Sequence, residues 1–154
     1  MSTTNSLVAE PVRNWVVVPA GATTASFDVN TFGVNSNTLI YIRATRNGVT
    51  VQNDITVFRA PVLGMSFTPS PVKGGLPVQV EISIDGKAAA GGAIIQLRSS
   101  NTSLLTVPTS VTIPAGRRST FYTANSKVVT ANQSVTVTAT RVDSVITRNL
   151  VITP

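Results

Sequence analysis

The stretch Val111-Thr112-Ile113-Pro114-Ala115-Gly116 decides the fold, because the chain contains it twice. The earlier copy is Val16-Val17-Val18-Pro19-Ala20-Gly21, which lies 95 residues upstream (111 minus 16). From these copies onward the two stretches stay in register without a gap, so that Thr45-Arg46 aligns with Thr140-Arg141. An internal repeat is stronger evidence for a fold than any single motif. This one predicts two copies of one β unit.

The two copies are of unequal length. Residues 62–154 hold a whole unit, whereas residues 12–61 match only its second half, because nothing upstream is expected to match residues 62–106. We therefore expect an N-terminal arm at 1–11, a half β unit at 12–61 and a complete unit at 62–154. A sandwich that lacks half of its strands has an apolar face with nothing packed on it. This imbalance indicates assembly with another polypeptide.

The composition is typical of β-sheet and turns. The 154 residues are 42% hydrophobic, include 10 Gly and 9 Pro, and show no sustained helical periodicity. The clearest strand pattern is Val78, Val80, Ile82 and Ile84, which alternate with polar residues as in a strand with one buried and one solvated face. The sequence therefore predicts an all-β protein of one domain or two small ones.

In the first copy, strands are expected at residues 12–18, around 25–29, around 40–44 and at 49–58. Asn47-Gly48 predicts a tight hairpin between the last two, because both residues tolerate positive φ. The polar residues 1–11 are either a frayed terminus or an arm that adds to the sheet of a neighbouring molecule.

The second copy resembles a known family. The run Gly86–Asn101, followed by Val107-Pro108 and by Val111–Gly116, is similar to bacterial immunoglobulin-like repeats. Such repeats occur in tandem in large surface proteins and in phage structural proteins. The resemblance implies an immunoglobulin-like antiparallel β-sandwich preceded by a partial (half) repeat of the same kind, a spacer, adhesive or decorating role, and no catalytic residues. This chain departs from a tandem array because it begins with a half repeat.

The composition also excludes several kinds of active site. The chain has no Cys and no His, so it has no disulfide, no thiolate zinc site and no histidine base. Its six carboxylates are scattered, and no pair can be assigned to one site as glycosidases require. No phosphate-binding loop or nucleophile elbow is present. We expect a protein that is not an enzyme, with no catalytic residue, no cofactor and no metal.

The net charge of +6 has two interpretations. The basic residues of the second unit either attract it to an acidic surface, such as a capsid shell, or keep it soluble. We do not expect a nucleic-acid partner, because no aromatic residues are interleaved with basic ones on one face. We expect no membrane partner either, because the longest apolar stretch, Ala88–Ile95, is too short to span a bilayer. The N-terminus has no secretory signal pattern.

Comparison of the outward strand positions of the two copies identifies a candidate interaction site. At five positions the half unit has a large apolar side chain where the complete unit has a polar one. These residues are Trp15, Val17, Phe32, Tyr41 and Phe58. Exposed apolar patches mark interaction sites, so we expect these residues to bind a partner protein. The alternatives are that the half unit packs on residues 62–106 of its own chain, or that Trp15 covers the junction between the units.

The leading hypothesis is a non-enzymatic structural protein, in its sharpest form a phage capsid decoration or cement protein on the virion surface. It would stabilise a larger assembly through its half β unit and would form homo-oligomers. The alternative is a binding or spacer module of a bacterial extracellular adhesin or carbohydrate-active protein at the cell surface, with Trp15 and Tyr41 placed against sugars.

Overall fold

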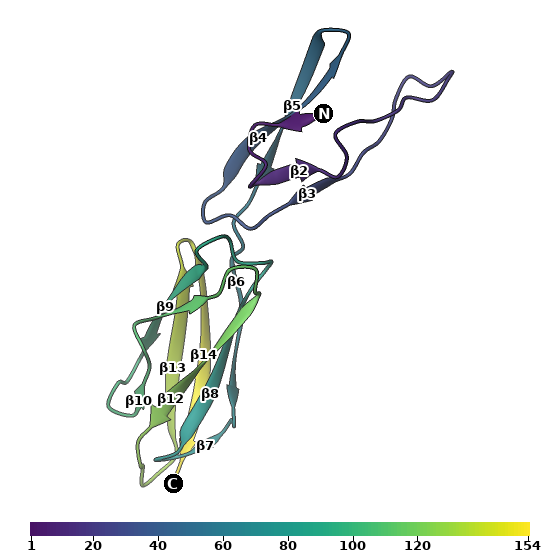
Figure 1. The fold of residues 1–154 in the computed structure, drawn as a ribbon. Helices are drawn as coiled ribbons and strands as arrows, with labels where there is room; N and C mark the ends of the chain where they lie inside the picture. Colours follow the sequence, from purple (N-terminus) through teal and green to yellow (C-terminus); the bar gives the residue numbers. More distant parts are fainter. The chain divides into compact units, whose positions relative to one another are not determined.

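The protein is built of β-strands and turns and contains no helix (Figure 1). The computed structural model describes all residues from 1 to 154. The chain divides into two compact units, unit 1 at Met1–Arg59 and unit 2 at Ala60–Pro154. The predicted all-β class is confirmed, and the division between the units lies two residues before the expected one.

Unit 2 is a sandwich of two sheets. One sheet has the strand order β10-β12-β8-β6, and the other has the order β11-β9-β13-β14-β7. All pairs are antiparallel except β7 with β14, which is parallel. The strands are β6 (Val62–Thr68), β7 (Val72–Lys73), β8 (Pro77–Ile84), β9 (Ala93–Ser99), β10 (Leu105–Thr106), β11 (Ser110–Ile113), β12 (Ser119–Ser126), β13 (Gln133–Arg141) and β14 (Ser144–Thr153). The immunoglobulin-type connectivity implied by the resemblance stays a prediction.

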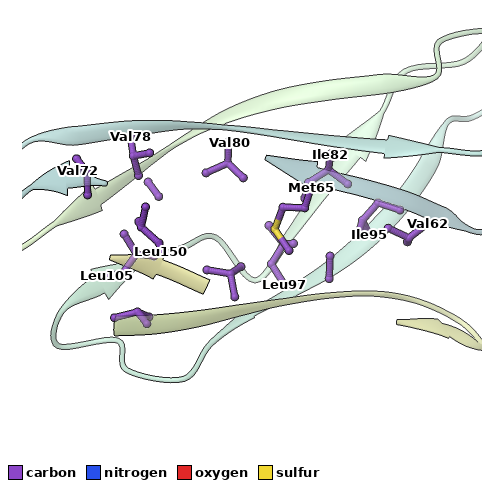
Figure 2. Packing of buried hydrophobic residues seen from close by; sticks show 14 of the residues in the cluster. Val62, Met65, Val72, Val78, Val80, Ile82, Ile95, Leu97, Leu105 and Leu150 are labelled. Carbon is purple, nitrogen blue, oxygen red and sulfur yellow. The ribbon is translucent and has the colours of Figure 1, made fainter. Parts of the chain in front are cut away.

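The core of unit 2 lies between the two sheets, where apolar side chains from both interdigitate (Figure 2). The predicted alternation of β8 is confirmed, since Val78, Val80, Ile82 and Ile84 are buried and the residues between them are not. Ile95 of β9 belongs to the same cluster from the other sheet. Full burial of each such side chain contributes roughly 1.5–3 kcal/mol, so β8 is a major source of the stability of unit 2.

Unit 1 has two smaller sheets, ordered β1-β4-β5 and β2-β3. Its core cluster contains Val8, Ala9, Val34, Ile40 and Ile42. The strands are β1 (Ser2–Thr3), β2 (Ala9–Pro11), β3 (Val29–Thr31), β4 (Thr38–Arg46) and β5 (Val49–Val57).

The long hairpin of unit 1 repeats that of unit 2. In β4–β5, Thr38 pairs with Val57, and in β13–β14 Gln133 pairs with Ile152, each residue shifted by 95. The predicted tight turn is confirmed, because Asn47 and Gly48 both have positive φ, at 50° and 80°. The repeat seen in the sequence is therefore a repeat of strand pairing.

The prediction of a separate arm at residues 1–11 is wrong. β1 pairs with β4, and β2 pairs with β3, so these residues belong to unit 1. The prediction that nothing upstream matches residues 62–106 is also wrong for the last nine of those residues, because residues 2–10 repeat the backbone of residues 98–106 at a shift of 96. The amide of Leu7 donates to Asn5 Oδ1 at 3.1 Å, and the amide of Ser103 donates to Asn101 Oδ1 at 3.0 Å.

Two predicted strands of unit 1 are not formed. Residues 12–18 and 25–28 lie instead in a long two-legged loop between β2 and β3 (Figure 1). In unit 2 the equivalent residues are strands because they have partners: β11 pairs with residues 93–96 of β9, and residues 119–123 of β12 pair with residues 79–83 of β8. Unit 1 has no counterpart of those partner segments. A strand pattern without a neighbour to complete its hydrogen bonds does not become a strand.

Candidate interaction surface on unit 1

The clearest difference between the units is at two equivalent positions that precede the same turn. Val18 and Ile113 are each followed by Pro-Ala-Gly, and the turn glycines Gly21 and Gly116 have φ of 81° and 75°. Ile113 is fully buried at 0% exposure, whereas Val18 is 42% exposed. The turn is thus repeated, but the core that covers the side chain is present only in unit 2.

The segment after this turn is also less buried in unit 1 than in unit 2. Phe27 is 43% exposed, whereas its equivalent Tyr122 is half-buried and packs against the core of unit 2. The hydroxyl of Tyr122 is buried without a hydrogen-bond partner, and desolvation by this burial raises its pKa to about 12. Val29 is half-buried, whereas its equivalent Ala124 is fully buried.

The hairpin β4–β5 also has positions that are less buried than their equivalents in unit 2. Ile55 and Val57 are half-buried, whereas their equivalents Leu150 and Ile152 are fully buried. Ala44 is likewise less buried than Ala139. We use the name open face for six residues of unit 1 that align with core-facing positions of unit 2 and are less buried than those positions, namely Val18, Phe27, Val29, Ala44, Ile55 and Val57.

The open face results from the strands that unit 1 lacks. In unit 2 the equivalent positions pack against side chains of β6, β8 and the first half of β9, including Met65, Val80 and Ile95. None of these segments has a counterpart in unit 1, whose sheets correspond only to β10-β12 and to β9-β13-β14. Unit 1 is therefore the second half of the sandwich with its inner layer partly uncovered.

The five residues predicted as the partner site are all exposed, between 37% and 71%. Trp15 and Val17 lie on the loop between β2 and β3, where the Arg13 guanidinium lies 5.3 Å from the centre of the Trp15 ring. Tyr41 is on the outer face of β4, opposite Asp54 on β5. Phe32 follows β3, and Phe58 follows β5. The site residues thus lie on four separate segments, and only Trp15 and Val17 share one.

The five aligned outward positions are apolar and exposed in unit 1 and polar in unit 2, as the sequence comparison expected. Unit 2 also exposes large apolar side chains on the outer faces of its strands, among them Ile94 and Phe121. The positions that align with the core of unit 2 distinguish the two units as well. Sequence reasoning missed the open face as a set, although the signal was available: each open-face residue aligns at a shift of 95 with an inward position of the complete unit.

The remaining features of the molecule offer no comparable site. A hollow of about 240 Å³ lies beside β1 and β2, lined by Met1, Ser2, Thr3, Ser6, Glu10, Pro11 and Asn14. No three acidic, His or Cys side chains gather where they could hold a metal ion. The structure contains no helix able to cross a membrane.

Comparisons with known proteins give little information. No family model and no curated protein sequence matches the chain. Among solved structures, domains 4 and 5 of the S-layer protein SbsC share 16% identity and a TM-score of 0.46 with it, over 99% of this chain and 69% of that one. A longer S-layer structure, rSbsC(31-844), shares 16% identity and a TM-score of 0.42, over 99% of this chain and 19% of that one. Neither is described as a phage or capsid protein.

Proposed function

We propose that this is a non-enzymatic structural protein that joins a larger assembly by burying the open face of unit 1 against a partner protein. The observation that carries the proposal is the pair Val18 and Ile113, which precede the same Pro-Ala-Gly turn but are 42% and 0% exposed. A side chain of a core position that is left open in water favours association, because covering it removes apolar surface from solvent.

Burial of the open face contributes favourable free energy to association. Full burial of a large apolar side chain contributes roughly 1.5–3 kcal/mol, and the open face has several that are only partly covered. The core of unit 1 itself has five buried residues, against twenty in unit 2. Burial of further apolar surface against a partner therefore adds proportionally more stability to the small core of unit 1 than to the closed core of unit 2. The partner is either a second copy of this chain or a different subunit.

Light scattering over a concentration series tests the proposal. We expect concentration-dependent association that Val18→Ser with Phe27→Ser weakens at least about tenfold, because each loses roughly 1 kcal/mol or more of apolar burial. The matched control is Trp15→Ser with Tyr41→Thr, which removes the outward residues predicted from the sequence. A chain that stays monomeric and binds no dye specific for apolar surface would contradict the proposal.

The outward residues Trp15, Val17, Phe32, Tyr41 and Phe58 form a second, separate hypothesis for the contact. The same pair of double variants decides between the faces, because each removes apolar area from only one of them. Weakened association in the Trp15 and Tyr41 variant alone would assign the contact to the outer face.

We propose that the assembly lies at a surface, either that of a phage capsid or that of a bacterial cell. The open face suits a structural protein in either place. Immunogold labelling with an antibody to unit 2 separates the two settings. Label on capsids supports decoration of the virion, and label on the cell exterior supports the cell-surface alternative.

A further inference from the structure

Unit 2 shows what covers the equivalent of the open face. Strand β8 runs antiparallel to β12, and Thr120, Tyr122 and Ala124 pair with Ile82, Val80 and Val78. This pairing extends over residues 119–125. The apolar side chains of β8 are buried, so the strand both completes the hydrogen bonds of β12 and fills the core.

The corresponding residues 24–30 of unit 1 have the side-chain pattern of a strand but lack a neighbour equivalent to β8. Their inward positions carry Ala25, Phe27 and Val29, in the alternation of a strand. β2 already occupies one edge, since Pro11 pairs with Val29 and the Val12 amide donates to the Asp28 carbonyl at 2.9 Å. No strand pairs with the other edge.

We propose that unit 1 binds an extended segment of a partner polypeptide as an added β-strand, which pairs antiparallel with residues 24–30 in the place that β8 occupies in unit 2. The inference rests on the proposed function and specifies the partner chemistry. The added strand presents apolar side chains at alternate positions to Phe27 and Val29, and its polar side chains point to solvent.

An added strand fits this edge better than a flat apolar surface does. A flat surface would cover Phe27 but would leave the backbone N–H and C=O groups of residues 24–27 without partners, and buried polar groups require them. Strand addition satisfies both needs, because main-chain hydrogen bonds provide affinity and alternate side chains provide specificity. Exposed sheet edges are the known templates for such pairing.

Hydrogen exchange on the full-length chain tests the inference. The probe is a synthetic peptide of residues 75–86, which contains β8, and the control peptide carries Val80→Lys and Ile82→Lys. With the first peptide we expect exchange at residues 24–30 to slow by at least about tenfold, through added hydrogen bonds. Residues 15–18 should not change, because their equivalents pair with β9 and not with β8. A chain with Phe27→Lys should show no slowing.

A covalent version tests the same geometry without depending on the solubility of the peptide. A copy of residues 62–97 is placed before Ser2, because residue 97 directly precedes the equivalent of Ser2. We expect slow exchange at both 24–30 and 15–18 in this variant. Unchanged exchange at 24–30 in the variant, or equal slowing with the control peptide, would overturn the inference.

The outcome also separates this inference from the proposed function. Association that the Val18 and Phe27 variant weakens, together with no slowing at 24–30, would retain the assembly role and reject the added strand. If the peptide of residues 75–86 also dissociates oligomers of the chain, a second copy supplies the strand. If it slows exchange at 24–30 in a chain that does not self-associate, the strand comes from a different protein.

Discussion

At the scale of single residues, the first residue of each hairpin turn has positive φ but differs in type between the two units. Val142 has φ of 53°, and its equivalent Asn47 has φ of 50°. A β-branched residue is strained in this region, by roughly 1–2 kcal/mol, whereas Asn tolerates it. We therefore expect Val142→Asn to raise the free energy of unfolding of unit 2 by about 1 kcal/mol, measured by urea denaturation.

The matched control is Asn47→Val, which should destabilise the hairpin of unit 1. Val142 is exposed, so the substitution removes no core contact. A loss of stability in Val142→Asn would mean that the turn is not strained.

Tyr122 gives a second prediction at this scale. Burial raises its pKa to about 12 from 10 in the unfolded chain. Because the unfolded chain loses the proton first, the free energy of unfolding should fall as the pH rises from 10 towards 12. Tyr122→Phe, which introduces the residue of unit 1 at this position, should remove that part of the decline and leave stability at pH 7 unchanged or higher. Urea unfolding at pH 7 and at pH 11 measures both effects.

At the scale of elements, the equivalent segments before the Pro-Ala-Gly turn should respond differently to the same change. Ile113→Ala should cost about 2–5 kcal/mol of unfolding free energy, because it leaves a cavity in a closed core. Val18→Ala should cost less than about 0.5 kcal/mol in the monomer, because its side chain is largely exposed. Chemical denaturation of the two variants measures the difference. Similar losses would show that Val18 lies in a filled core.

The elements that sequence reasoning predicted correctly are those whose partners are in the chain. β8 was predicted from alternation, and β4–β5 from alternation and Asn47-Gly48, because each pairs with a neighbouring strand of its own unit. Residues 12–18 have an equally good alternation but no neighbouring strand to pair with. Alternation alone does not show whether such a neighbour exists. Residues 2–10 were missed because the repeat shifts from 95 to 96 before the loop, although Thr3-Thr4-Asn5-Ser6 resembles Ser99-Ser100-Asn101-Thr102.

The candidate site predicted from the sequence stays a prediction, and the structure adds a second set of exposed apolar residues. The half unit was expected to be unfinished, and its outer residues such as Tyr41 were expected to carry the contact. The structure leaves Val18 and Phe27 exposed as well, although they align with core-facing positions of unit 2. Alternation assigns residues to two faces, but the buried face can be identified only when the covering layer is known.

At the scale of the whole molecule, unit 2 should fold without unit 1. The core cluster of unit 2 includes no residue before Ala60. We expect residues 60–154 alone to fold with the same unfolding midpoint as unit 2 has in the full chain. Calorimetry of the fragment and of the full chain compares the two midpoints. A fragment that melts much lower would mean that residues 1–59 contribute to that core.

The most direct test of the central claim is hydrogen exchange of the dilute, monomeric chain with no partner added. The claim is that the inner face of unit 1 lacks the strands that would close it. Amides of residues 15–18 and 24–28 should then exchange far faster than those of the equivalent residues 110–113 and 119–123 in the same sample. Equal protection of the two sets in the monomer would contradict the account.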